Sequence, residues 1–367
     1  MESVHTSSMT RDGYGRKDLV YFGGCDYFRL SGHPAVVQAI HEGLDEFGLN
    51  VAASRITTGN HALYGILEKR ICEFFKAPDA VLVSSGYLAN LVAAQGLSED
   101  FQNSIMDRGA HTSLVDGSTL ISPHPPLFYN HLDCHDLKSL LPVERKSESF
   151  VLLTDSVFSI TGEVAPISDL LEILPEHSMM LLDESHGVGV MGETGRGVFE
   201  NPLESDERVI RSITFSKAFG VYGGAVVGAR KWIRKMRENS RIYSGNTPLP
   251  LPIVCGILKS LELLDRSADF LIRLRKNIRK VQNSLKDCGF RFNREPVPIL
   301  SLKPKDEAEA GSFHESLLNH GVYPTQVRYP SPRDTPVFRF ALSSEHSPEH
   351  LEALVQSVYD AKKSRNS

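Results

Sequence analysis

Two apolar segments, each followed by polar and glycine residues, constrain the fold of this chain most. Met179–Leu182 is an uninterrupted apolar run, which is typical of a parallel strand buried on both faces of a sheet. Val209–Phe215 is a second apolar segment. Open α/β sheets carry their ligand sites where the strands end. The first segment leads into Asp183 and His186, and the second leads to Lys217. The sequence therefore predicts that an acid, an imidazole and an amine meet at one edge of one sheet.

These three side chains suit pyridoxal 5'-phosphate (PLP). A lysine amine can condense with the aldehyde of this cofactor, and a buried carboxylate can keep the pyridine nitrogen protonated, so that the ring acts as an electron sink. His186 could hydrogen-bond the phenolic oxygen of the ring. Taken singly, Asp183 and Lys217 fit a core strand with a capped loop and a surface lysine equally well. The glycines that follow both segments favour the cofactor site.

Two long motifs in this region resemble the α-oxoamine synthases, a family of PLP enzymes of fold type I. They are LDESHGVGVMGETGRG at residues 182–197 and TFSKAFG at residues 214–220, in the family's order and at its separation. The resemblance implies the α/β fold of a PLP-dependent transferase, with a mainly parallel seven-stranded sheet that has helices on both faces and a smaller C-terminal α/β domain. It also implies an N-terminal arm and helix over 1–47, a large PLP-binding domain over 48–249 and a small domain over 250–367.

The same resemblance assigns contacts with the cofactor phosphate. Ala80–Ser85 is a short apolar segment, expected to be a strand, and Gly86 and Tyr87 open the helix expected after it. A helix N-terminus carries free backbone N–H groups and partial positive charge, which suits a phosphate. Gly86 and Tyr87 match the family's phosphate-binding step, and Thr214 matches a second ligand of that phosphate.

Two more residues match positions that contact the cofactor in relatives. His111 matches a histidine that stacks on the pyridine ring, whereas a lone histidine is more often a surface or helix-capping residue. Ser159 matches a serine that contacts PLP. Asp155 stands in the same segment where relatives have glutamate, which keeps the carboxylate but shortens its reach.

Substrate contacts are implied in two further segments. Arg339 aligns with an arginine that clamps the amino-acid carboxylate, and a guanidinium offers two parallel charge-assisted hydrogen bonds for that task. Alternatively, Arg339 lies on the solvent face of an amphipathic strand. Ser54 and Arg55 resemble part of the family's Gly-Ser-Arg segment and would lie near the amino-acid pocket, or else belong to a plain connecting loop.

Two segments depart from the family pattern. Cys25-Asp26-Tyr27-Phe28-Arg29 resembles the family's Asn-Asp-Tyr-Leu-Gly, with cysteine in place of asparagine and arginine in place of glycine. Ile242–Pro248 stands where relatives place a segment that reaches into the neighbouring subunit's site, and its residues are altered. Because this segment reaches the neighbouring subunit in relatives, the resemblance implies a homodimer with shared active sites.

The implied activity is that of a PLP-dependent acyltransferase. Such an enzyme condenses a small α-amino acid (alanine, glycine or serine) with acyl-CoA or another acyl thioester, loses CO2 and yields an α-amino ketone. His111, Asp183, His186 and Lys217 would be catalytic, with Lys217 removing the Cα proton. One alternative is an aminotransferase of the same fold. Another is a non-catalytic partner subunit, but such subunits lose the lysine that this chain retains.

Composition excludes several other classes. The 367 residues are 41% hydrophobic and carry a net charge of −5, which gives no electrostatic argument for nucleic acid or an anionic membrane. No signal peptide or membrane-spanning segment is evident. The cysteines have no metal-binding spacing and are expected to be reduced thiols in a cytoplasmic protein without a metal. They are Cys25, Cys72, Cys134, Cys255 and Cys288.

Four further expectations concern local structure. Residues 1–16 are rich in small and polar residues and are expected to form a loose arm. Residues 250–285 are expected to be strongly helical, with a solvated charged face. The C-terminal part is expected to include a strand over 322–328. The glycine-rich segment 221–229 is expected to form a turn into an antiparallel strand.

Overall fold

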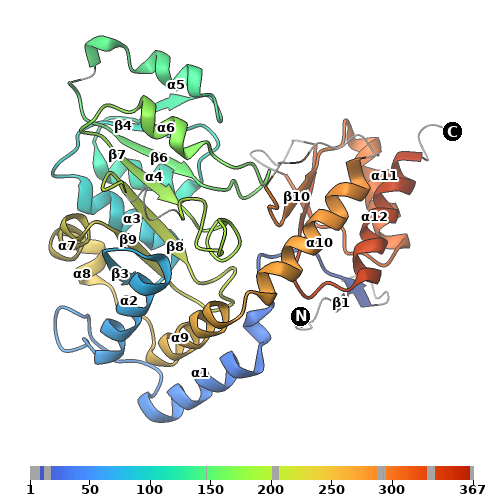
Figure 1. The fold of residues 1–367 in the computed structure, drawn as a ribbon, viewed down its shortest axis with the longest axis horizontal. Coiled ribbons are helices and arrows are strands. Elements are labelled where there is room, and N and C mark those ends of the chain that lie inside the picture. Colours follow the sequence, from blue (N-terminus) through green and yellow to red (C-terminus); the bar gives the residue numbers. More distant parts are fainter. Residues whose placement is uncertain are drawn as a thin grey trace. The chain divides into compact units, whose positions relative to one another are not determined.

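The computed structural model describes residues 9–11, 18–145, 147–200, 206–286, 292, 295–328 and 335–363 (Figure 1). Contacts divide the chain into two units, each described by itself below. Unit 1 is formed from Met1–Gly32, Ser159–Glu163 and Ala268–Ser367, and unit 2 from His33–Phe158 and Val164–Ser267. The domain boundaries suggested by the sequence, after residues 47 and 249, stay a prediction.

Unit 2 is built on a seven-stranded sheet in the order β3-β9-β8-β7-β6-β4-β5. Only β9 runs antiparallel to its neighbours, which confirms both the mainly parallel sheet and the antiparallel strand after the glycine turn. The strands are β3 (Asp79–Val83), β4 (Ser104–Asp107), β5 (Leu127–Tyr129), β6 (Val151–Asp155), β7 (Met179–Asp183), β8 (Val209–Thr214) and β9 (Gly224–Gly228).

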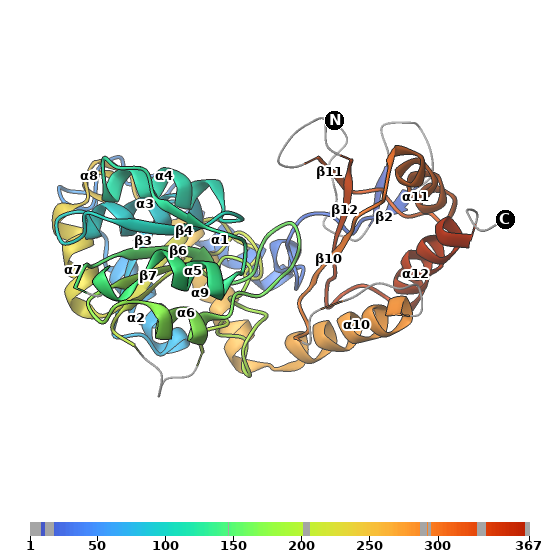
Figure 2. The same cartoon turned by 90° about the horizontal axis from the view of Figure 1, so that it is seen from above.

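Helices cover both faces of this sheet, as the resemblance implied (Figure 2). One face packs against α3 (Gly86–Leu97), α4 (Thr112–Ile121) and α7 (Arg230–Asn239). The other packs against α5 (Cys134–Leu140) and α6 (Ile167–Ile173). Successive side chains of a strand point to opposite faces, so a strand buried on both sides is mostly apolar. The uninterrupted apolar segments are therefore explained by two cores on either side of one sheet.

The remaining helices of unit 2 pack around its periphery. They are α1 (Pro34–Phe47), α2 (Ala62–Phe75), α8 (Arg241–Gly245) and α9 (Leu251–Arg266), with a short 3-10 turn at Val143–Arg145. The α1 and α9 helices approach closely at Gly43, where an added Cβ would lie 2.9 Å from the Cα of Pro252. Glycine is required there because the neighbouring atom belongs to backbone and cannot move aside.

Unit 1 contains a three-stranded antiparallel sheet in the order β10-β12-β11. Its strands are β10 (Ile299–Leu302), β11 (Gln326–Val327) and β12 (Val337–Ala341). Its helices are α10 (Asp269–Lys286), α11 (Glu307–Asn319) and α12 (Pro348–Lys363), with a 3-10 turn at Leu30–Gly32. A two-stranded ribbon joins β1 (Met9–Arg11) to β2 (Asp18–Val20).

Three expectations need correction. The expected loose arm contains a strand, because Met9–Arg11 pairs with Asp18–Val20. The helical stretch 250–285 consists of two helices, since Ser267 ends α9 and serine favours helix ends over helix interiors. The expected strand over 322–328 is reduced to Gln326–Val327, because Pro324 has no N–H to donate to a neighbouring strand.

Membrane-spanning helices, metal-binding clusters and cysteines were also considered in the sequence. In the described ranges no helix has the length and apolar character needed to cross a membrane. The same ranges hold no cluster of histidine, cysteine and carboxylate side chains arranged to bind a metal. Four cysteines are free thiols, whereas Cys288 lies outside the described residues. The cytoplasmic location stays a prediction.

Candidate active site

Three neighbouring strands of unit 2 deliver polar side chains to one edge of the sheet. Asp155 ends β6, Asp183 ends β7 and Thr214 ends β8, and the three strands are parallel. Asp155 and Asp183 are paired in register across β6 and β7. Lys217, three residues beyond Thr214, is half-buried, and its charge acts on both Asp155 and His111. The structure therefore brings the acid and the amine to the same edge.

The Asp183 carboxylate is buried and held by two neutral donors. Its Oδ1 atom accepts the backbone N–H of Ser185 at 2.8 Å, and its Oδ2 atom accepts the side-chain amide of Asn90 at 2.7 Å. These donors stabilise the ionised carboxylate without neutralising its charge. His186 lies in the turn that follows and is 5% exposed. The turn thus presents a fixed carboxylate and a buried imidazole after β7.

The His111 side chain is held at the N-terminus of α4. Its Nδ1 atom faces the hydroxyl of Ser113 at 2.7 Å and the backbone N–H of the same residue at 3.3 Å, while its own backbone N–H donates to Asp155 at 2.8 Å. Burial lowers the pKa of His111, and the Lys217 charge adds to that effect, although Asp183 opposes it. A neutral ring that accepts at Nδ1 carries its proton on Nε2. His111 is thus both a helix cap and a part of the site.

Asp155 has a different environment from Asp183. Its side chain is buried, and burial first, then the charge of Asp183, raises the pKa of Asp155 well above its usual range. Burial thus favours the neutral form of Asp155.

The N-terminus of α3 forms a cradle of close backbone contacts. The Ser85 side chain caps the helix by accepting the N–H of Leu88. A Cβ added at Gly86 would lie 2.7 Å from the Cβ of Thr214, and one added at Gly224 would lie 2.5 Å from the carbonyl oxygen of Ser85. Glycine at both positions lets the helix end approach the Thr214 hydroxyl. A helix N-terminus beside a hydroxyl suits a phosphate, so this cradle would fit the phosphate of PLP.

Tyr87 lies beside this cradle and is 40% exposed. Its hydroxyl donates to the carboxylate of Asp116, and its ring lies edge-on to His111 with 6.3 Å between the centroids. Donation to that carboxylate raises the pKa of Tyr87. The side chain is thus held by α4, while its backbone N–H belongs to the first turn of α3.

Ser54 and Arg55 lie in the loop between α1 and α2, and their contacts join this loop to itself and to α2. The carbonyl oxygen of Ser54 accepts the N–H groups of Thr57 and Gly59, each at 3.1 Å. Arg55 forms a two-pronged ion pair with Glu68, with distances of 2.5 and 3.2 Å, and lies 5.0 Å from the centroid of the Tyr64 ring. This pairing occupies the Arg55 guanidinium, so it stabilises the loop.

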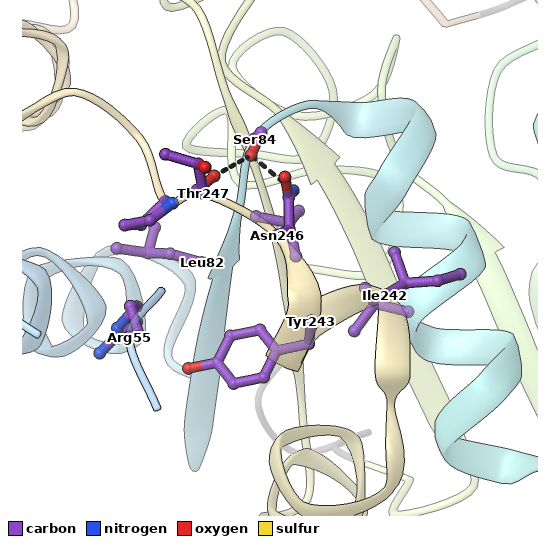
Figure 3. Close-up of a pocket in the computed structure, with 10 residues that line it drawn as sticks. Arg55, Leu82, Ser84, Ile242, Tyr243, Asn246 and Thr247 are labelled. Atoms are coloured by element: carbon purple, nitrogen blue, oxygen red, sulfur yellow. Dashed lines mark hydrogen bonds between the residues drawn. The ribbon is translucent and has the colours of Figure 1, made fainter. Parts of the chain in front are cut away.

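Arg55 also lines a small pocket (Figure 3). Its wall includes the segment that was expected to reach a neighbouring subunit, because Tyr243, Asn246 and Thr247 come from that segment. The Asn246 amide donates to the Ser84 hydroxyl at 2.8 Å, and that hydroxyl donates to the carbonyl oxygen of Thr247 at 3.1 Å. The segment is therefore tied to the end of β3, next to the Ser85–Gly86 cradle.

Ser159 and Arg339 belong to unit 1. Arg339 is 7% exposed, so it is not on the solvent face of an amphipathic strand. Its Nε atom donates to the carbonyl oxygen of Ser159 at 2.6 Å, and its Nη atoms lie 3.2 Å from the carbonyl oxygen of Gly24 and 3.3 Å from Cys25 Sγ. These three acceptors are neutral. A buried guanidinium with neutral acceptors gains most from a bound anion.

Arg29, which replaces the family's glycine, has a backbone φ of 54°. This left-handed conformation suits glycine and strains other residues, which accounts for the glycine in the family motif. The Arg29 guanidinium donates to the carbonyl oxygen of Tyr21 at 3.2 Å and lies 3.4 Å from His346 Nε2. Arg29 therefore combines a strained backbone with side-chain contacts to Tyr21 and His346.

Three residues of the site were missed by the sequence reasoning. Asn90, Ser113 and Ser212 are buried, and Asn90 bonds to the other two as well as to Asp183. One signal was available for Asn90, since it is a polar residue in the otherwise apolar stretch Leu88–Ala94 of an expected helix. A buried amide is costly unless it is hydrogen-bonded, so such a residue indicates partners.

Comparisons with known proteins agree with this geometry. The family model for class I and II aminotransferases matches residues 17–358. The 8-amino-7-oxononanoate synthase of Methylococcus capsulatus is 32% identical over 98% of this chain and 93% of its own. Serine palmitoyltransferase from S. paucimobilis, solved with a bound PLP–myriocin adduct, is 26% identical with a TM-score of 0.86, covering 95% of this chain and 89% of its own. The 8-amino-7-oxononanoate synthase of Francisella tularensis is 25% identical with a TM-score of 0.80, covering 95% and 98%.

Proposed function

Because the chain belongs to the α-oxoamine synthases, PLP-dependent acyltransferases of the class I and II aminotransferase family, we propose that it condenses a small α-amino acid with an acyl thioester. CO2 is lost, and the product is an α-amino ketone. The candidate amino acids are alanine, glycine and serine, and the candidate acyl donor is an acyl-CoA. Among relatives, the glycine-rich motif at residues 182–197 most resembles that of 8-amino-7-oxononanoate synthase.

The residues at the sheet edge fit the cofactor that this family uses. Gly86, Tyr87 and Thr214 would hold the phosphate of PLP, Asp183 would hold the protonated ring nitrogen, and Lys217 would bind the aldehyde carbon. When bound, PLP supplies an electron sink for negative charge that develops at the substrate Cα. The observation that carries the proposal is that the Asp183 carboxylate and the Lys217 amine lie at one edge of the sheet, beside the Gly86–Thr214 cradle.

Lys217 is the proposed base that takes the Cα proton and returns it. The Lys217 residue is half-buried, and it acts electrostatically on both Asp155 and His111. A neutral His111 presents an uncharged aromatic ring, which suits stacking against the pyridine ring. His186 would donate to the phenolic oxygen of the cofactor. These roles are proposals that rest on the placement of the side chains in unit 2.

Arg339 is the proposed binding residue for the substrate carboxylate. Support comes from its burial and from its three neutral acceptors, since a two-pronged carboxylate would add negative charge beside the guanidinium. Ser159, whose carbonyl oxygen accepts from Arg339, would contact the cofactor as well. Ser54 would lie near the amino-acid pocket. We also propose that the protein is a homodimer, with residues 242–248 contributing to the neighbouring site.

The test is a condensation assay with purified protein and PLP. Glycine, alanine and serine are each combined with acyl-CoAs of graded chain length, and released CoA thiol and CO2 are measured. We expect thiol release only when an amino acid and an acyl-CoA are both present. Thiol release without an amino acid would contradict condensation, and conversion of the amino acid to its keto acid without a thioester would favour the aminotransferase alternative.

The Lys217→Ala variant tests the proposed base. Removing a general base is expected to lower the condensation rate at least about 100-fold. The matched control is Lys231→Ala, since Lys231 is an exposed lysine of α7 whose ion pair with Glu207 is 3.7 Å long. We expect this control to keep the parent rate. Equal rates for the parent and Lys217→Ala would remove the basis of the mechanism.

A further inference from the structure

Asn90 uses all of its side-chain hydrogen-bonding groups within the site. It is fully buried on α3, and its amide nitrogen donates to Asp183 at 2.7 Å and to the Ser113 hydroxyl at 2.8 Å. Its amide oxygen accepts the Ser212 hydroxyl at 2.5 Å. An ionised carboxylate only accepts hydrogen bonds, so the amide nitrogen must be the atom that faces Asp183. The three contacts come from β7, α4 and β8.

The network continues from Asn90 to His111. The Ser113 hydroxyl accepts one Asn90 hydrogen and faces His111 Nδ1 at 2.7 Å. Because the hydroxyl already accepts from the amide, its own hydrogen is available for Nδ1. A chain of donors therefore runs from Ser212 through Asn90 and Ser113 to His111. The same amide bonds Asp183, so one side chain connects the carboxylate and the imidazole.

A purely structural role would not require this arrangement. The neighbours of Asn90 on α3 include Ala89, Val92 and Ala93, all buried in one apolar core. Asparagine is a weaker helix former than alanine, and its burial is costly without partners. An apolar residue at this position would pack in the same core. The asparagine is thus explained by its partners at the sheet edge.

We propose that Asn90 is a positioning residue that orients Asp183 toward the ring nitrogen of PLP and, through Ser113, orients His111. This inference rests on the proposed cofactor site. The amide holds one carboxylate oxygen in place and leaves its negative charge uncompensated. That charge is then directed at the ring nitrogen, while the ring of His111 is set by the other branch of the network.

The experiment compares the binding of two ligands to cofactor-free protein. One is PLP, and the other is its carbocyclic analogue, in which CH replaces the ring nitrogen. Both present the same phosphate and aldehyde, but only PLP offers Asp183 a nitrogen. Dissociation constants are measured by titration of visible absorbance. For Asn90→Ala we expect PLP binding to weaken about ten- to a hundredfold, because a hydrogen bond to a charged group is lost. Binding of the analogue should change much less.

Two further variants separate the branches of the network. Ser113→Ala cuts the connection to His111 but leaves the Asn90–Asp183 bond, so it should weaken PLP and the analogue equally. Ser212→Ala removes only the bond that orients the amide, so it should weaken PLP by about threefold and the analogue hardly at all. Ser212→Ala also keeps the test usable if Asn90→Ala does not fold.

The matched control is Ser178→Ala. Ser178 is fully buried, and its hydroxyl accepts the N–H of Phe150 at 3.1 Å, just before β7 begins and so at the opposite end of that strand from Asp183. This variant should lose stability without changing either dissociation constant. Equal weakening of both ligands in Asn90→Ala, or an unchanged PLP constant, would overturn the positioning role. If the parent protein itself gives no visible band with PLP, the proposed function fails instead.

Discussion

At the scale of single residues, Asp155 is a buried group whose ionisation should affect stability. Burial and the Asp183 charge raise its pKa well above the usual range. Because folding raises the pKa of Asp155, its protonated form contributes to the free energy of unfolding. This contribution is complete below the unfolded-state pKa of about 4 and is lost as pH rises through the folded-state pKa. At neutral pH the ionisation of Asp155 therefore opposes folding.

Asp155→Asn removes this ionisation, while the amide oxygen can still accept the N–H of His111. We expect the free energy of unfolding of the cofactor-free variant to exceed that of the parent at neutral pH. The gain should be about 1.4 kcal/mol for each unit by which folding raises the pKa, and it should vanish near about pH 3. Urea unfolding at a series of pH values measures it. Asp45→Asn, an exposed site on α1, is the control, and a gain independent of pH would contradict the explanation.

At the scale of elements, two glycines in neighbouring helices should respond oppositely to the same substitution. Gly65 lies inside α2, and an added Cβ would meet nothing within 4 Å. Gly65→Ala should therefore raise the free energy of unfolding by about 0.5–1 kcal/mol, because alanine loses less backbone freedom on folding.

Gly43→Ala is the contrasting change. Its Cβ would lie 2.9 Å from the backbone Cα of Pro252 in α9, so α1 and α9 would have to separate. We expect a loss of about 1–3 kcal/mol, the usual cost of overpacking. Thermal or urea unfolding of both variants checks the pair. A stabilised Gly43→Ala variant would contradict a close backbone contact between α1 and α9.

At the scale of the whole molecule, the proposed dimer can be tested at one exposed side chain. Ile56 is 61% exposed and follows Arg55, which lines a pocket together with Tyr243 and Asn246. The latter two belong to the segment expected at the subunit interface. A buried lysine without a partner would oppose association. Ile56→Lys should therefore weaken dimerisation at least about tenfold, as measured by sedimentation over a range of concentrations.

Ile272→Lys is the matched control, because Ile272 is 60% exposed on α10 of unit 1. We expect this variant to associate like the parent protein. If the two lysines weakened dimerisation equally, the loop between α1 and α2 would not be a specific part of the interface. A parent protein that is monomeric at micromolar concentration would contradict the dimer itself.

The sequence by itself determined the central sheet and the order of its motifs. Uninterrupted apolar runs such as Met179–Leu182 identify strands buried on both faces, and the fold class was predicted from them together with the motif resemblance. The positions of Asp183 and Lys217 relative to strand ends follow from the same local pattern, whereas Thr214 was implied by the resemblance alone. Short-range periodicity is enough to locate such strands, because consecutive apolar residues indicate a strand that is buried on both faces.

Only the tertiary structure decided which polar groups are partners. Asn90 and Asp183 are 93 residues apart in sequence, yet their side chains lie 2.7 Å apart. Likewise, the sequence did not indicate that Glu68 is the partner of the Arg55 guanidinium. Hydrogen bonds and ion pairs depend on distances of a few tenths of an ångström between separate elements. Local patterns predict each element, whereas the packing of elements sets the distances between them.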